Sequence, residues 1–94
     1  MRVKWLRTAL QNLTTEAEYI AQDNPAAAAE LVTSVVKAVA RLARYPASGR
    51  AGRVIGTREL VIPSTPYIVP YRVRLGVIEI LRVLHSARKW PKQF

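Results

Sequence analysis

The stretch that decides the fold is TRELVIPSTPYIVPYRVRLGVIEILRVLHSARKWP, which runs from Thr57 to Pro91. It holds three runs rich in β-branched and aromatic residues, and proline- and glycine-containing breaks separate them. The runs are Glu59–Ile62, Tyr67–Val73 and Val77–Leu84. This pattern predicts three antiparallel strands, followed by a polar cluster of His85, Arg88, Lys89 and Trp90.

The break at Leu75-Gly76 fixes the register of the last two strands. A hairpin that closes around these two residues places Val73 opposite Ile78 and Tyr71 opposite Ile80. One face of the hairpin is then almost entirely apolar and is expected to face the core. The other face carries both apolar and charged side chains, and we expect it to be exposed and to form the functional surface. Its members are Ile68, Pro70, Arg72, Arg74, Val77, Glu79, Leu81, Val83 and His85.

Arg82 is the only charged residue on the predicted core face. A charge in that position requires a partner, because an unpaired buried charge is strongly unfavourable. We therefore expect Arg82 to form a salt bridge with Glu16 or Glu18, which lie in a helical segment near the N-terminus.

Two amphipathic helices precede the strands. Apolar residues recur at steps of three and four from Thr8 to Gln22, and again from Pro25 to about Arg44. Asn24 and Pro25 are the residue types of an N-cap and a first helical position, so the helices are expected to form a hairpin. With a short strand at Val3–Leu6, the predicted fold is α+β. In this β-α-α-β-β-β chain, the helical hairpin packs on a small, mostly antiparallel sheet.

Length and composition limit the kinds of function. Ninety-four residues are enough for one hydrophobic core, so residues 1–94 are expected to form a single domain. The chain has no cysteine, one histidine and six acidic residues, so we expect no metal site and no cofactor. No apolar run approaches the roughly 20 residues of a membrane span, so we expect a cytoplasmic protein without a membrane partner.

The positive charge is concentrated after the first third of the chain. Residues 1–36 contain three basic and four acidic side chains, whereas residues 37–94 contain twelve basic side chains and only two acidic ones. Such an asymmetry favours a polyanion or an acidic protein as the partner of the C-terminal two-thirds. The alternative interpretation is a soluble surface that is basic but binds no specific partner.

These features together resemble the RelE/ParE superfamily, the toxins of bacterial type II toxin–antitoxin modules. The resemblance is carried by the Asp23-Asn24-Pro25 connection, the helix end from Val39 to Pro46, and the segments Arg58–Leu60, Tyr67–Val73 and Ile80–His85. It implies a toxin–antitoxin hetero-oligomer, in which a C-terminal segment of the cognate antitoxin wraps the toxin. The basic charge predicts that this segment is acidic and amphipathic. We assign its contacts to Ile68, Arg72, Leu81 and Val83.

The resemblance leaves two targets open. ParE-like members poison DNA gyrase, whereas RelE-like members cleave mRNA in the ribosomal A site. RelE-type ribonucleases commonly carry an arginine after the first tyrosine of the third sheet strand, and this chain has Ile68 at that position. RNA cleavage without a metal needs cations near the scissile phosphate, so the departure favours gyrase over the ribosome. A non-toxic basic binding module with the same fold is a third alternative.

The C-terminal cluster is the predicted site in either branch. In a ribonuclease, His85 would be the general acid or base, Arg88 and Lys89 would stabilise the phosphate, and Trp90 or Tyr67 would stack on a base. In a gyrase poison, the target contacts would be Arg74, Arg88, Lys89, Trp90 and Lys92. Structural roles compete with both interpretations, because a lone histidine is more often a hydrogen-bonded structural residue and Trp90 is suited to sealing the core.

Overall fold

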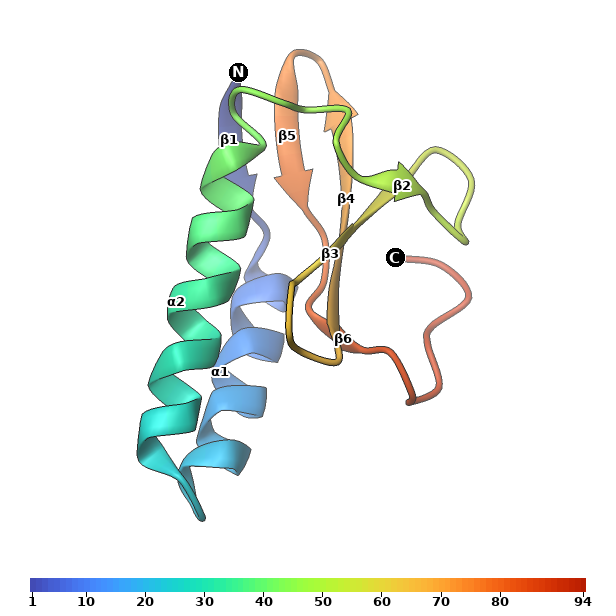
Figure 1. Cartoon of the computed structure of the whole chain (residues 1–94). Helices are drawn as coiled ribbons and strands as arrows, with labels where there is room; N and C mark the ends of the chain where they lie inside the picture. The colour runs from blue at the N-terminus through green and yellow to red at the C-terminus, as the bar shows by residue number, and fades with distance from the viewer.

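The computed structural model, which describes residues 1–94, combines two helices with a six-stranded sheet (Figure 1). The elements follow the chain as β1 (Arg2–Trp5), α1 (Arg7–Ala21), α2 (Pro25–Arg41), β2 (Arg50–Ala51), β3 (Arg58–Val61), β4 (Tyr67–Arg74), β5 (Val77–Ile80) and β6 (Leu84–His85). The strand order is β1-β5-β4-β3-β2, and β6 pairs with β4. Only the β1–β5 pair is parallel. The predicted α+β class is confirmed, although β2 was not expected.

The helical hairpin forms at the predicted connection. The side chain of Asn24 accepts a hydrogen bond from the backbone N–H of Ala27 at 3.1 Å, and Pro25 is the first residue of α2. The two helices lie side by side on one face of the sheet (Figure 1). Their apolar stripes meet the inward side chains of the strands in a core of fourteen buried residues, which includes Leu13, Val35, Leu42, Tyr71 and Ile78.

The β4–β5 hairpin has the predicted register, with Val73 opposite Ile78 and Tyr71 opposite Ile80. Leu75 and Gly76 form its two-residue turn and have φ angles of 52° and 75°. Positive φ at both central positions is the geometry of a type I′ turn, which matches the right-handed twist of the two strands.

The predicted strand Val77–Leu84 is interrupted. After Ile80 the chain leaves β5 and pairs with β4 again at β6, where Ile68 lies opposite Leu84 and Tyr67 opposite His85. Continuing the β4–β5 register would have placed Ile68 opposite residue 83, so the segment 81–83 contains one extra residue, as in a β-bulge. Side chains alternate across a strand, and the extra residue therefore turns His85 to the helix side of the sheet.

Pro70 lies where the ladder breaks. The N–H of Leu81 donates to the carbonyl of Pro70 at 2.9 Å. The matching bond of an antiparallel pair would run from Pro70 to the carbonyl of Leu81, but proline has no N–H. The guanidinium of Arg82 donates to that carbonyl instead, at 2.7 Å. The predicted salt bridge from Arg82 to Glu16 or Glu18 is wrong, because the guanidinium satisfies the Leu81 carbonyl and Glu16 pairs with Arg88 instead.

The expected exposure of the mixed face is wrong for three of the residues assigned to the antitoxin. Ile68, Leu81 and Val83 are 4%, 2% and 2% exposed. The bulge turns Val83 into the core between sheet and helices. Only Arg72 of the four assigned residues keeps an accessible side chain, with a relative exposure of 33%.

Ile68 and Leu81 belong to the sheet strands, and a second layer of side chains lies on the sheet face away from the helices. Glu59 lies on this face, is 3% exposed, and forms a salt bridge to Arg50 at 3.1 Å. It also accepts a hydrogen bond from the backbone N–H of Arg53 at 2.8 Å. The guanidinium of Arg53 lies 3.7 Å from the ring centre of Trp90. This stack ties the segment between β2 and β3 to the C-terminal segment. Both segments lie on the side of the sheet remote from the helices (Figure 1).

Candidate functional site

The candidate site forms where the C-terminal cluster meets α1 at the start of β4. The carboxylate of Glu16 is its centre, because two side chains converge on it. The Tyr67 hydroxyl donates to Oε1 of Glu16 at 2.8 Å, and Nη1 of Arg88 donates to Oε1 and Oε2 at 2.7 and 2.9 Å. The His85 ring packs edge-on against Tyr67, with ring centres 5.4 Å apart and planes at 81°. The site thus joins α1, β4, β6 and the C-terminal segment.

His85 is held on three sides. Its Nδ1 accepts a hydrogen bond from the N–H of Ala87 at 3.1 Å, and its carbonyl accepts one from Nε1 of Trp90 at 3.1 Å. An accepting Nδ1 requires that the neutral ring carry its proton on Nε2. The lone pair on Nδ1, which a general base would use, is therefore already engaged by the N–H of Ala87. The neutral ring can offer other molecules only the N–H donor on Nε2.

A cavity of about 170 Å³ opens at this point. Its walls are formed by Asn12, Thr15, Glu16, Val83, Leu84, His85, Arg88, Lys89 and Trp90. Asn12 also fixes the bulge to α1, because its side-chain oxygen accepts a hydrogen bond from the N–H of Val83 at 3.1 Å. The structure contains no group of three side chains suited to hold a metal ion. The cavity walls therefore offer cations, hydrogen-bond donors and one carboxylate.

Burial, the hydrogen bond to the Glu16 carboxylate and the charge of that carboxylate together raise the pKa of Tyr67 to about 12, and the positive charge of Arg88 opposes them. The phenol therefore stays protonated at neutral pH and acts as a hydrogen-bond donor. It is 4% exposed, which leaves its ring face unavailable for stacking on a base as the structure stands.

The structure brings only part of the predicted target-binding set together. Arg88, Lys89 and Trp90 line the same cavity, and Lys92 follows them in the exposed C-terminal segment. Arg74 lies at the other end of the eight-residue strand β4, about 20 Å away along the strand. The predicted set thus falls into two separate surfaces, one at the C-terminal segment and one at the β4–β5 hairpin.

The sequence analysis missed the roles of three residues in and around the site. Glu16 was expected to pair with Arg82, and neither Arg53 nor Glu59 was assigned to a site. Glu16 and Arg88 are 72 positions apart in the chain, and no local spacing marks them as partners. Arg53 and Glu59 carry the charges that fix the covering layer.

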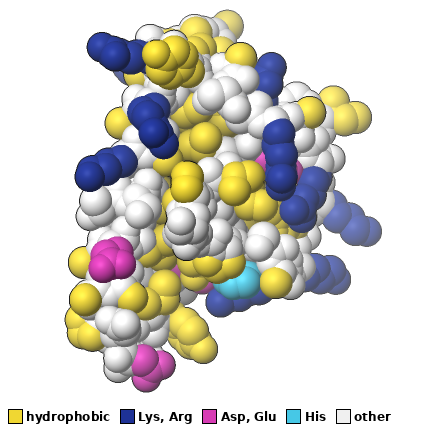
Figure 2. Space-filling view, viewed as in Figure 1, with side chains coloured by type: hydrophobic (Ala, Val, Ile, Leu, Met, Phe, Trp, Pro, Cys, Tyr) yellow, Lys and Arg dark blue, Asp and Glu magenta, His cyan; other side chains and the backbone are white.

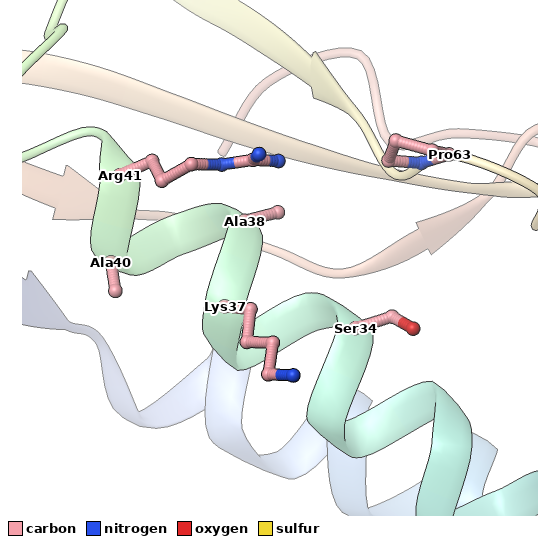
Figure 3. Close-up of a pocket in the computed structure, with 6 residues that line it drawn as sticks. All are labelled: Ser34, Lys37, Ala38, Ala40, Arg41 and Pro63. Carbon is pink, nitrogen blue, oxygen red and sulfur yellow. The ribbon is translucent and has the colours of Figure 1, made fainter.

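A second hollow, of about 490 Å³, lies between α2 and the turn after β3. Figure 3 shows Ser34, Ala38 and Arg41 projecting from α2 on the side of Pro63, whereas Ala40 points away. A neighbouring hollow of about 290 Å³ shares Ser34 and Pro63 with it and continues to Ala27. Together they form a groove along α2, with Lys37 and Arg41 at one end and Glu30 at the other.

The molecular surface repeats the charge division of the sequence. Figure 2 shows Lys and Arg side chains along the right-hand side and at the upper left of the view, with the histidine near the lower edge of the right-hand group. The acidic side chains at the lower left of the view lie over the helices. No helix of the structure combines the length and the apolarity that a membrane crossing requires.

Comparison with known families decides the assignment. The model of the ParE toxin family, described as the ParE toxin of the type II toxin–antitoxin system parDE, matches residues 3–90. The chain belongs to the RelE/ParE family of type II toxins. This confirms the resemblance predicted from the sequence. The alternative of a non-toxic binding module with the same fold is set aside, and a cognate antitoxin is the partner of this toxin.

Individual relatives agree with the family. The toxin is 48% identical over 91 residues to Y4kP, a candidate toxin of Sinorhizobium fredii, and the match covers 97% of this chain and 94% of Y4kP. It is 38% identical over 87 residues to the toxin RelE2 of Caulobacter vibrioides, covering 93% and 97% of the two chains. The structure of a chromosomal ParDE toxin–antitoxin system from P. aeruginosa superposes with a TM-score of 0.82 at 30% identity, covering 90% of this chain and 95% of that one.

Proposed function

We propose that this toxin arrests growth in the cytoplasm by poisoning DNA gyrase. The observation that carries the proposal is Ile68, which stands where RelE-type ribonucleases commonly have an arginine. Ile68 is 4% exposed and lies between Val61 of β3 and Leu84 of β6. No cation occupies this position, and a metal-free ribonuclease would lack one of the charges that stabilise its transition state.

The remaining acid–base groups support the same target. Nδ1 of His85 is engaged by the N–H of Ala87, and Arg88 is engaged by both oxygens of Glu16. The Tyr67 phenol has a raised pKa and donates to the same carboxylate. A ribonuclease would have to release several of these contacts before any of the three groups reached a phosphate. In a gyrase poison, Arg88, Lys89, Trp90 and Lys92 would serve as protein contacts.

The experiment compares two assays on one preparation of purified toxin. DNA supercoiling by gyrase and translation of a reporter mRNA are measured side by side. We expect inhibited supercoiling and an intact message. His85→Ala is expected to fold, as judged by thermal melting, and to retain growth arrest. Message cut at codon-defined positions with unaffected supercoiling would contradict the proposal, as would complete loss of toxicity in a folded His85→Ala variant.

A ribosome-dependent ribonuclease is the second candidate, and the 170 Å³ cavity favours it. His85, Arg88 and Lys89 line this cavity together, and 38% identity links the chain to a relative named RelE2. In this case His85, as the imidazolium, would donate a proton to the leaving oxygen, while Arg88 and Lys89 would stabilise the phosphate. His85→Ala or Arg88→Ala would then lower cleavage by about 10²-fold or more.

We further propose that an acidic amphipathic segment of the antitoxin lies in the groove along α2. The groove spans Ala27 to Arg41, about 20 Å of helix, which is long enough for several turns of a partner helix. Its apolar floor includes Leu31, Ala38 and Pro63, and Lys37 and Arg41 lie at one end. An extended or helical acidic chain complements this arrangement better than the buried side chains of Ile68, Leu81 and Val83.

A further inference from the structure

The tip of the β4–β5 hairpin carries a residue that its own turn disfavours. Leu75 has a φ angle of 52°, in the left-handed region where a branched side chain is strained and where asparagine or glycine is preferred. The other non-glycine residue with positive φ is Ser64, which is small and polar. Leu75 is thus the one large apolar side chain placed in this conformation.

Packing within the chain does not compensate for the strain. The Leu75 side chain is 94% exposed, so it gains almost nothing from burial. Val73 on the same hairpin is 47% exposed. An exposed apolar residue in a strained turn breaks two local rules at once, and such violations without internal benefit concentrate at contacts with other molecules.

Cations surround the tip on the sheet face away from the helices. Arg2 and Arg74 flank Val77 from the two neighbouring strands, and in the next row Lys4 and Arg72 flank Glu79. Arg72 donates to Glu79 at 2.6 Å. That bond, together with the charges of Arg72, Arg74 and Lys4, holds the pKa of the Glu79 carboxyl below its usual value despite the opposing effect of burial. These two rows therefore hold four cations and one carboxylate.

We propose that this hairpin patch, Leu75 with Arg2, Lys4, Arg72 and Arg74, is a second surface, besides the C-terminal segment, by which the toxin holds its protein target. Leu75 enters an apolar pocket on that target, and the cations meet carboxylates around the pocket. The inference rests on the proposed function, because it requires a folded protein as the target. Arg72 is thereby assigned to the target rather than to the antitoxin.

The shape and chemistry of the patch select this partner. The tip is convex and presents an isolated leucine, which a preformed pocket encloses but an extended antitoxin segment does not. The groove along α2 offers that segment a concave surface instead. A nucleic acid would meet the cations but has no apolar pocket for leucine, since its recognition depends on phosphates, base edges and stacking.

The test is Leu75→Asn in the full-length toxin. Asparagine before Gly76 gives a preferred type I′ turn, so the melting temperature is expected to stay equal or rise. Gyrase inhibition and growth arrest are expected to fall by about tenfold or more, while affinity for the antitoxin stays unchanged. Leu75→Gly is a second variant that relieves the strain in the same way. Ile55→Asn is the matched control, because Ile55 is 99% exposed on another loop.

The outcomes separate this inference from the proposed function. Full growth arrest in folded Leu75→Asn and Leu75→Gly would overturn the inference, and so would equal losses in Ile55→Asn or loss of antitoxin binding. If wild-type toxin left gyrase untouched, the gyrase proposal would fail. In that case a Leu75→Asn variant that no longer arrested growth would still support a protein contact at the tip. Loss of DNA binding on Arg74→Glu, without any effect of Leu75→Asn, would assign the patch to nucleic acid and overturn the inference.

Discussion

At the scale of single residues, Glu16 organises the candidate site. Its carboxylate accepts one hydrogen bond from the Tyr67 hydroxyl and two from Arg88, and its side chain is 13% exposed. An accepting carboxylate close to a phenol disfavours the phenolate, and burial acts in the same direction. The result is a tyrosine that keeps its proton far above neutral pH.

The raised pKa of Tyr67 predicts a loss of stability in alkali. Its pKa is about 12 in the folded protein, against 10.0 for an unperturbed tyrosine. The folded state therefore holds this proton more tightly than the unfolded state. The resulting stabilisation, on the order of 2 kcal/mol, is complete below about pH 10 and is lost as the pH rises towards 12. Chemical denaturation at a series of pH values should show that the free energy of unfolding falls less steeply between about pH 10 and 12 in Tyr67→Phe than in the wild type.

Glu16→Gln serves as the matched variant for this prediction. It keeps an acceptor for the Tyr67 hydroxyl but removes the negative charge, so it should lower the pKa of Tyr67 and reduce the alkaline loss of stability. Identical pH profiles for the wild type, Tyr67→Phe and Glu16→Gln would show that the Tyr67–Glu16 contact does not govern stability in this range.

At the scale of elements, the decisive feature is the interruption between β5 and β6. Pro70 cannot donate to Leu81, and Arg82 takes over the carbonyl that is left. The register shift that follows brings His85 beside Tyr67 instead of onto the opposite face. Without the extra residue in segment 81–83, the side chains of the C-terminal cluster would begin on the wrong side of the sheet.

A double-mutant cycle tests this account of the interruption. Arg82→Ala should destabilise the fold by about 1–2 kcal/mol, because the Leu81 carbonyl loses its donor. In the Pro70→Ala background, the same change should have a smaller effect, because the alanine N–H offers that carbonyl a replacement. The effect of proline on the unfolded chain is present on both sides of the cycle and cancels. Strict additivity in urea denaturation would argue against the exchange of donors.

At the scale of the whole molecule, the division of charge separates the surfaces. The cations at the C-terminal segment, at the hairpin patch and at one end of the α2 groove lie on different parts of the molecule. If antitoxin and target bind as proposed, they use distinct cationic surfaces, and a variant in one surface should leave the other partner's binding intact. Electrostatic contributions of this kind weaken as the salt concentration rises.

Charge reversal in the groove tests where the antitoxin binds. Lys37→Glu should raise the dissociation constant of the toxin–antitoxin complex by about tenfold, and added salt should shrink the difference. Growth arrest in the absence of antitoxin should be unchanged. Arg7→Glu is the control, since it makes the same change of charge on an exposed position outside the groove. An equal weakening by both variants, measured by titration calorimetry, would mean that net charge alone decides the affinity.

The sequence by itself determined the helical hairpin, its capped connection and the register of the β4–β5 turn. Each of these depends on residues close together in the chain, such as Asn24 with Ala27, or Leu75 with Gly76. The tertiary structure alone decided the bulge, the burial of Ile68 and Leu81, and the pairing of Glu16 with Arg88. These depend on contacts between distant segments, 72 positions apart for Glu16 and Arg88, and alternation along a strand carries no information about which surface will cover it. The one extra residue of the bulge moves every later side chain of the strand to the opposite face of the sheet. Only the packing of the sheet determines where in the chain that residue lies.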